Sequence, residues 1–324
     1  MRLRQPLTTA GRQHCRAAVI FLLAAGGCTE SFSPEMPFQE SVVVYGIISN
    51  VTSDHAIRMF TTYGSDALTA GEPGPDTHIT DAAVIVSDLS APGTATDTCR
   101  YSPEMRVYFW SPPSLERGHQ YRLLASTPSL GEVRADVAIP RPAMLSAGNP
   151  LTLREPSNFI SDFFVSVSLA PDAKGYIIRL LVEYESFEGG TWTPGRIEVP
   201  RAPGSTGGSP GGWVYPSLTR RLGDDVGGDV DYQIMSFDRD AYLWAISEVR
   251  SRHEAGGLRF LRAVVHLTQV DVHLYNYYCI ANGFRDPYTI RVDGPDYTNV
   301  IGGHGVFGAA VVDSITIGLP ESVR

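Results

Sequence analysis

Short runs in which hydrophobic and polar positions alternate make up most of the chain between residues 41 and 139. Val, Ile, Tyr and Phe dominate these runs, and Gly, Pro, Asp and Ser separate them. Such runs are typical of β-strands, because branched and aromatic side chains fit a half-buried pleated surface. We expect strands at 41–49, 56–63, 82–89, 106–110, 121–126 and 133–139. This succession, with no helical period, predicts a β-sandwich of the immunoglobulin or prealbumin type over residues 41–141.

A tight corner is expected just before the fifth of these strands. Pro112, Pro113 and Gly118 favour a turn there, and Tyr121 lies at the start of the strand that follows. We therefore expect the Tyr121 side chain to pack at the edge of the sandwich.

The strand pattern resumes in the second half of the chain, so this half is also expected to be β-rich. The runs that predict strands there lie at 163–170, 176–184, 196–200, 231–237, 258–270 and 305–319. Residues 202–213 (APGSTGGSPGGW) are so rich in glycine that we expect a mobile loop without regular structure.

One or two short helices are expected within this second half. Asp271 can cap a helix that ends before Gly283, with Leu274, Tyr278 and Ala281 on one face. A second helix over 241–252 would begin behind Asp240, although a strand fits the same residues.

Two prolines mark the expected boundary between the halves. Pro140 and Pro142 restrict the backbone and interrupt sheet pairing. We predict two β-sandwich-like domains in a mainly all-β protein, the first over 41–141 and the second over 142–324.

The first 28 residues have the order of a lipoprotein signal. Four arginines are followed by the apolar run 17–25 and by small residues directly before Cys28. An apolar run this short does not cross a bilayer, which requires about 20 residues. We predict a signal peptide over 1–27 and attachment of lipid such as palmitate to the Cys28 thiol. Residues 28–40 would form an acidic tether to the membrane.

Net charge and cysteine content bear on the partners of the protein and on a possible disulfide. The chain carries a net charge of −9, and the leader takes away arginines only, so the mature protein is more acidic still. This charge disfavours nucleic acid as a partner. Of the four cysteines, Cys15 lies in the leader and would be removed with it, and Cys28 would carry the lipid. Cys99 and Cys279 are the two that remain. These two could form a disulfide in an oxidising periplasm, or could be two separate buried thiols.

Three stretches of the chain resemble a known family. They are the opening SVVVYGIISN with DAAVIVSD and RGHQYRLLAS, the tyrosine-rich VDVHLYNYYCIANG, and TNVIGGHGVFGAA at 298–310. Together they resemble the secreted lipoprotein family catalogued as domain of unknown function 4249. The resemblance implies a lipid-anchored outer-membrane protein with an N-terminal β-sandwich, often encoded beside TonB-dependent transporters. It implies no activity and no catalytic residue.

The run Gly302-Gly303-His304-Gly305 suggests two roles. His304 could bind a metal ion or move protons, but no partner residue accompanies it. We expect instead that the glycines permit unusual torsions or close packing beside a buried Phe307.

Two further groups of residues could contact a ligand. Asp224, Asp225, Asp229 and Asp231 form an acidic cluster, but their spacing fits no calcium loop. Trp213 and Tyr215 follow the glycine-rich segment, where they could grip a sugar or peptide, or could anchor the end of that segment.

No catalytic motif is recognisable. Ser205 and Ser209 lack the Gly-x-Ser-x-Gly pattern, and no zinc-protease motif occurs. We therefore expect neither catalytic residues nor a cofactor. The leading hypothesis is a non-catalytic binding or scaffold lipoprotein beside an outer-membrane transporter. A structural or adhesive surface protein and a hydrolase of glycan or peptide are the alternatives.

Overall fold

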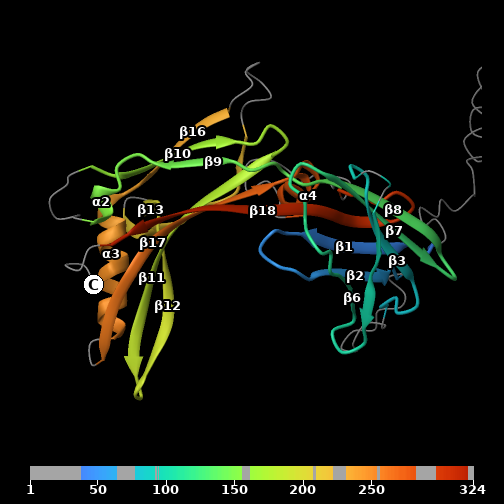
Figure 1. Ribbon diagram of the computed structural model, residues 1–324, viewed down its shortest axis with the longest axis horizontal. Coiled ribbons are helices and arrows are strands. Elements are labelled where there is room, and N and C mark those ends of the chain that lie inside the picture. Colours follow the sequence, from blue (N-terminus) through green and yellow to red (C-terminus); the bar gives the residue numbers. More distant parts are fainter. Residues whose placement is uncertain are drawn as a thin grey trace, which may run out of the picture. The chain divides into compact units, whose positions relative to one another are not determined.

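The computed structural model describes residues 38–63, 77–91, 93, 95–154, 161–206, 209–221, 231–253, 256–281 and 297–319. All of its labelled elements lie in the compact unit formed by residues 40–324. They are strands with three helices among them, so the predicted all-β class with few short helices is confirmed (Figure 1).

The first half of the chain forms the predicted sandwich. One sheet contains β1 (Val42–Ile48), β2 (His55–Thr61), β6 (Val107–Trp110) and β5 (Arg100–Ser102) in that order. The facing sheet contains β4 (Thr96–Thr98), β3 (Ala83–Asp88), β7 (Gln120–Thr127) and β8 (Gly131–Ala138). With β4 counted as an additional strand beside β3, the order β1-β2-β6-β5 corresponds to the A-B-E-D sheet of an immunoglobulin-type domain. The short strands β4 and β5 were not predicted.

The tyrosine corner of such domains is present. The Tyr121 hydroxyl accepts a hydrogen bond of 3.0 Å from the backbone N–H of Glu116. Its ring is buried and lies 5.4 Å from that of Trp110. The expected turn and packing of Tyr121 are present, but its ring lies within the first core and not at the edge of the sandwich.

Residues near the C-terminus complete this sandwich. Strand β18 (His304–Gly318) begins parallel to β1, with His304 opposite Val43 and Ala309 opposite Ile48. Just before it, the backbone of Ile301 exchanges two hydrogen bonds with Arg134 of β8. The closing segment, which we define as residues 297–309, therefore pairs with an edge strand from each of the two sheets.

The glycines of this segment have the predicted backbone role. Gly302 and Gly305 have φ angles of 84° and 103°, which side chains rarely adopt. A Cβ on Gly303 would lie 2.5 Å from the carbonyl oxygen of Val42. Phe307 is fully buried, and its backbone exchanges two hydrogen bonds with the Asn299 side chain. The glycines at 302, 303 and 305 thus allow the closing segment to pack closely against β1 and β8.

The second half surrounds a second core. One side is formed by β11 (Gly175–Glu188), β12 (Thr191–Val199) and β17 (Gly257–Val270), together with the end of β18 and the short β15 (Thr219–Arg220). A separate sheet contains β16 (Asp231–Phe237), β10 (Phe163–Leu169) and β9 (Met144–Ala147). The helices α2 (Leu151–Arg154) and α3 (Arg239–Arg252) contribute further buried side chains. Of these elements, β9, β15 and α2 were not predicted.

Helix α3 covers residues 241–252, where the sequence fits either a helix or a strand. Its apolar residues Ala241, Tyr242, Ala245, Ile246 and Val249 recur on one buried face. The cap is Asp238 and not the predicted Asp240, because the Asp238 carboxylate accepts the N–H of Ala241 at 2.9 Å. Asp240 belongs to the first helical turn instead.

The glycine-rich segment differs from its prediction. Ala202–Thr206 forms β13 and Ser209–Val214 forms β14, which pair antiparallel. Glycine is conformationally free in an isolated chain, but strand pairing can still order it. The expectation of a loop without regular structure is therefore wrong.

Strand β18 is shared by both halves. Its first residues pair with β1, and residues from Ala310 to Gly318 pair with β17. Phe307, Ala309 and Val311 belong to the first core, whereas Ile317 belongs to the second. One nine-stranded sheet therefore crosses the position at which the sequence predicts a domain boundary.

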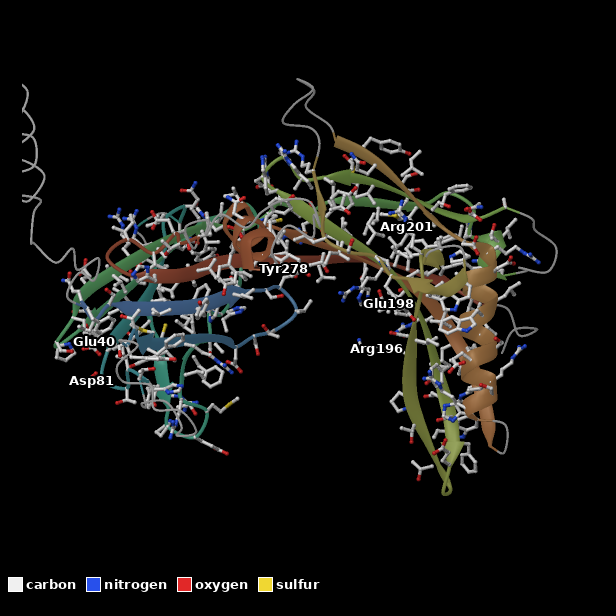
Figure 2. All side chains as sticks on the ribbon, turned by 180° about the vertical axis from the view of Figure 1, so that it is seen from behind. Glu40, Asp81, Arg196, Glu198, Arg201 and Tyr278 are labelled. Carbon is white, nitrogen blue, oxygen red and sulfur yellow. The ribbon has the colours of Figure 1, made fainter. Side chains whose placement is uncertain are left out.

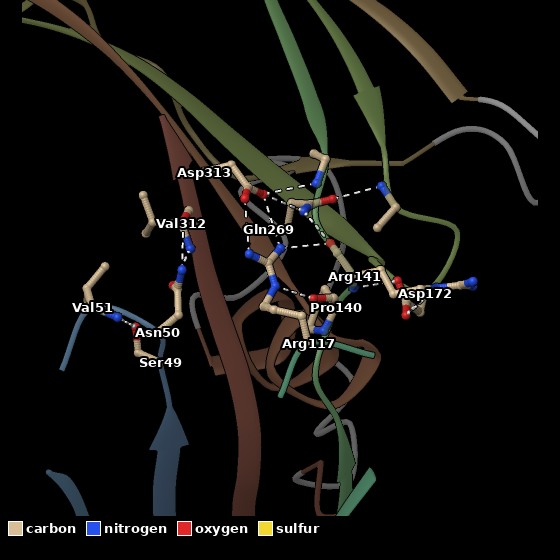
Figure 3. A network of polar contacts seen from close by, with 12 residues as sticks. Ser49, Asn50, Val51, Arg117, Pro140, Arg141, Asp172, Gln269, Val312 and Asp313 are labelled. Carbon is tan, nitrogen blue, oxygen red and sulfur yellow. Dashed lines mark hydrogen bonds and ion pairs between the residues drawn. The ribbon is translucent and has the colours of Figure 1, made fainter. Parts of the chain in front are cut away.

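A polar network holds the chain at this crossing (Figure 3). The Arg117 guanidinium makes two hydrogen bonds to the Asp313 carboxylate, at 3.0 and 3.1 Å. It also donates to the carbonyl oxygens of Pro140 and Arg141. Gln269 donates to Asp313 and Arg141 from the other side. The two-proline segment is thus fixed at several backbone atoms.

Candidate ligand-binding groove

A cavity lies on the outer face of the sheet formed by β1, β2 and β18. Side chains on β1 alternate, so Val42 and Val44 enter the first core while Val43 and Tyr45 face outward. The cavity encloses about 490 Å³, within the range of ligand pockets. We call it the tyrosine groove, and its lining residues are Val43, Tyr45, Phe60, Thr61, Thr62, Tyr63, Tyr277, Tyr297, Thr298, His304 and Gly305.

Helix α4 (Val272–Ala281) contributes the Tyr277 side of the groove. Asp271 caps this helix as predicted, because its carboxylate accepts the N–H groups of His273 and Leu274 at 3.1 and 3.0 Å. The same carboxylate accepts the N–H of Ala309 in β18 at 3.0 Å. Burial raises the pKa of the Asp271 carboxyl, while these N–H donors act in the opposite direction. One side chain thus fastens the helix to the sheet.

A glycine in β18 lets the helix approach closely. A Cβ on Gly308 would lie 2.8 Å from Cβ of Leu274, so any larger residue would displace α4. This approach brings the Tyr277 ring to 5.6 Å from the ring of Tyr45, at an interplanar angle of 63°. The Tyr45 ring lies at the same distance from Phe60, at a shallower 32°. Three segments distant in sequence therefore form one aromatic cluster.

Tyr297 is the first residue of the closing segment. Its hydroxyl is 2.6 Å from Nδ1 of His273, a hydrogen bond that fixes its ring beside α4. Burial raises the pKa of the Tyr297 hydroxyl, so the phenol stays neutral at physiological pH.

Within the described part of the chain, the lining carries no permanent charge. The eleven described lining residues include no Asp, Glu, Lys or Arg, and His304 is the one histidine among them. A charged ligand would therefore find no ionic partner among these residues. The lining suits a neutral molecule that offers both apolar faces and hydrogen-bonding groups.

The predicted ligand residues Trp213 and Tyr215 lie elsewhere. The Trp213 ring packs 5.1 Å from that of Trp244 on α3 and borders the second core. This is the anchoring role considered from the sequence. Tyr215 is 45% exposed and is not part of the tyrosine groove.

Cys99 and Cys279 are free thiols here. Cys99 is buried in the first core, where burial raises its pKa to about 12. Cys279 lies on α4 and is partly buried. The structure therefore contains two separate thiols, the alternative to a disulfide.

Other predicted features fall partly outside the described residues. Cys28 and its leader do so, as do Asp224, Asp225, Asp229 and Gly283. Within the described ranges, no three His, Cys, Asp or Glu side chains gather closely enough to hold a metal ion. No helix in those ranges has the length and hydropathy needed to cross a membrane.

The sequence did not indicate the groove. The tyrosine-rich segment was recognised as a helix, but Tyr278 was placed on its main apolar face. In the structure Tyr278 (Figure 2) is 48% exposed. Leu274 makes the contact with β18 instead. No ligand contact was expected for the His304 side chain, yet it is exposed and lines the groove. The clustering of tyrosines was the one available signal.

Comparison with known proteins adds no identification. No protein-family model matches the chain, and no curated protein matches it significantly. The resemblance to the lipoprotein family therefore stays a prediction.

Proposed function

We propose that this protein is a lipoprotein of the cell envelope, anchored to the outer membrane through Cys28, that acts as a non-catalytic binding or scaffold component. Its partner would be a TonB-dependent outer-membrane transporter. The observation that carries the binding role is the tyrosine groove, a cavity of about 490 Å³ lined by aromatic and hydroxyl side chains.

The position of the groove along the chain supports this proposal. Ser41 follows the predicted tether directly and exchanges hydrogen bonds with Thr62, a lining residue. A tether over residues 28–40 spans at most about 45 Å when fully extended. A groove this close to a lipidated cysteine stays within reach of partners at the membrane surface.

Replacing the lipidated residue tests the anchor. Cys28→Ser removes the thiol, so we expect the variant to lose metabolic palmitate labelling and to leave the membrane fraction. Cys279→Ser is the matched control, because it removes a thiol far from the leader. Unchanged labelling of Cys28→Ser would refute the lipoprotein assignment.

Affinity purification tests the scaffold role. The tagged full-length protein, extracted from membranes in mild detergent, should retain a transporter in stoichiometric amount. Tyr277→Ala should reduce that amount if the groove forms the contact, whereas Tyr278→Ala should not. Recovery of the tagged protein alone under these conditions would contradict the proposed partnership.

A further inference from the structure

The aromatic side chains of the tyrosine groove form a bent platform. Tyr45 lies between Phe60 and Tyr277, with 5.6 Å between ring centres on either side. All three rings are only partly buried, so each keeps some surface open to the cavity. Tyr63 is more exposed still. Such rings can cover the C–H face of a saturated ring while the tyrosine hydroxyls remain in water.

The chemistry around this platform is neutral and rich in hydroxyl groups. The threonines at positions 61, 62 and 298 accompany the tyrosines, and the lining residues that the structure describes include no acid, arginine or lysine. Among these residues an anionic ligand would lose its hydration without gaining an ionic partner. A neutral ligand with many hydroxyls exchanges its hydrogen bonds to water for equivalent ones.

The backbone beneath the groove offers no free strand edge to which an extended peptide could add. Val43 and Tyr45 belong to a strand that pairs with β2 on one side and with β18 on the other. The outer edge of β2 is also occupied, because Phe60 bridges to His78 and Thr61 donates to Thr77. Peptides that bind by adding a strand require a free edge, and these strands offer none.

We propose that the tyrosine groove binds a neutral glycan, with a sugar ring stacked on Tyr45 and Tyr277. This inference rests on the proposed binding function and names the ligand class of the same site. A cavity of about 490 Å³ has room for a short oligosaccharide segment.

Calorimetric titration of the full-length protein in detergent tests the proposal. The probes are the neutral hexasaccharides of maltose, cellobiose and xylose type, an oligogalacturonate of equal length, and an uncharged hexapeptide. We expect saturable binding of at least one neutral glycan and none of the acidic one. Tyr277→Ala should weaken that binding about tenfold or more, because the stacking face is lost.

Two substitutions separate stacking from other effects. Tyr277→Phe keeps the ring and should remain within about threefold of the native affinity. Tyr278→Ala removes the neighbouring exposed tyrosine and should change nothing. If Tyr277→Ala lowers the melting temperature, Tyr63→Ala at the exposed rim provides the same test without disturbing α4.

The outcomes distinguish this inference from the function on which it rests. Absence of binding to all neutral glycans, or binding that survives Tyr277→Ala and Tyr63→Ala, would overturn the inference. Binding of the hexapeptide alone would overturn it too, in favour of a peptide ligand. In each of these cases a transporter retained in the affinity purification would leave the proposed function intact.

Discussion

The two hydrophobic cores of this protein are completed in different ways. The second core is drawn from one continuous half of the chain, with residues between Leu153 and Leu319. The first core lies between the sheets of the immunoglobulin-type sandwich, yet it includes Val300, Phe307, Ala309 and Val311 from the far end of the chain. The N-terminal sandwich is therefore complete only when the C-terminal strand has joined it.

This difference makes the protein more than a pair of independent domains. Burial of four apolar residues from the closing segment and β18 contributes to the first core, and the same strand continues into the second. Loss of the closing segment should therefore expose apolar surface in the sandwich and remove a strand neighbour from β1. Substitutions at the closing segment, at the crossing and in the second core should therefore lower the free energy of unfolding by different amounts.

The largest effect is expected where the closing segment touches β1. Gly303→Val would place a side chain against the Val42 carbonyl, so the backbone would have to move. We expect the free energy of unfolding to fall by about 3 kcal/mol, measured by chemical denaturation. His304→Ala is the neighbouring control and should change stability by less than about 0.5 kcal/mol, because the side chain is exposed. Equal losses in both variants would contradict a backbone role for the glycine.

A smaller loss is expected at the crossing between the cores. Asp313→Ala removes the carboxylate that pairs with Arg117 and accepts from Ala143 and Gln269. The paired side chains are only 15% and 17% exposed, so we expect a loss of about 2 kcal/mol and faster proteolysis near Pro140.

The matched control for this pair lies on β7 and β8. Arg122 and Asp136 form a similar two-bonded pair, but they are 35% and 45% exposed. Asp136→Ala should cost less than about 1 kcal/mol, because water screens exposed ion pairs. A resistant prolyl segment in Asp313→Ala would show that the network does not hold the crossing.

The smallest of the three losses is expected at the border of the second core. Trp213→Ala removes a ring that packs on Trp244, and partial burial limits the expected cost to about 1.5 kcal/mol. Tyr215→Ala, two residues away, should stay within about 0.5 kcal/mol, since its ring is largely exposed. Thermal melts of both variants would show whether Trp213 anchors hairpin β13–β14 as the packing indicates.

The sequence alone determined most of the strands, because their signal is local. Alternation and branched residues located β1, β2, β3, β6, β7, β8, β10, β11, β12, β16, β17 and β18, and Asp271 identified the start of α4. The corner at Tyr121 was equally local, since it depends on residues close in sequence. The positive φ angles of Gly302 and Gly305 are local too, whereas the close packing of Gly303 is against Val42, which lies far away in the chain.

Only the tertiary structure decided which of these elements became neighbours. The pairing of β18 with β1, the approach of α4 over Gly308 and the meeting of Tyr45 with Tyr277 join residues that lie far apart in sequence. Periodicity specifies which face of a strand is apolar, but not which other strand or helix will cover it. The same reason explains why Trp213 was considered as a ligand residue and why the tyrosine groove was not predicted at all.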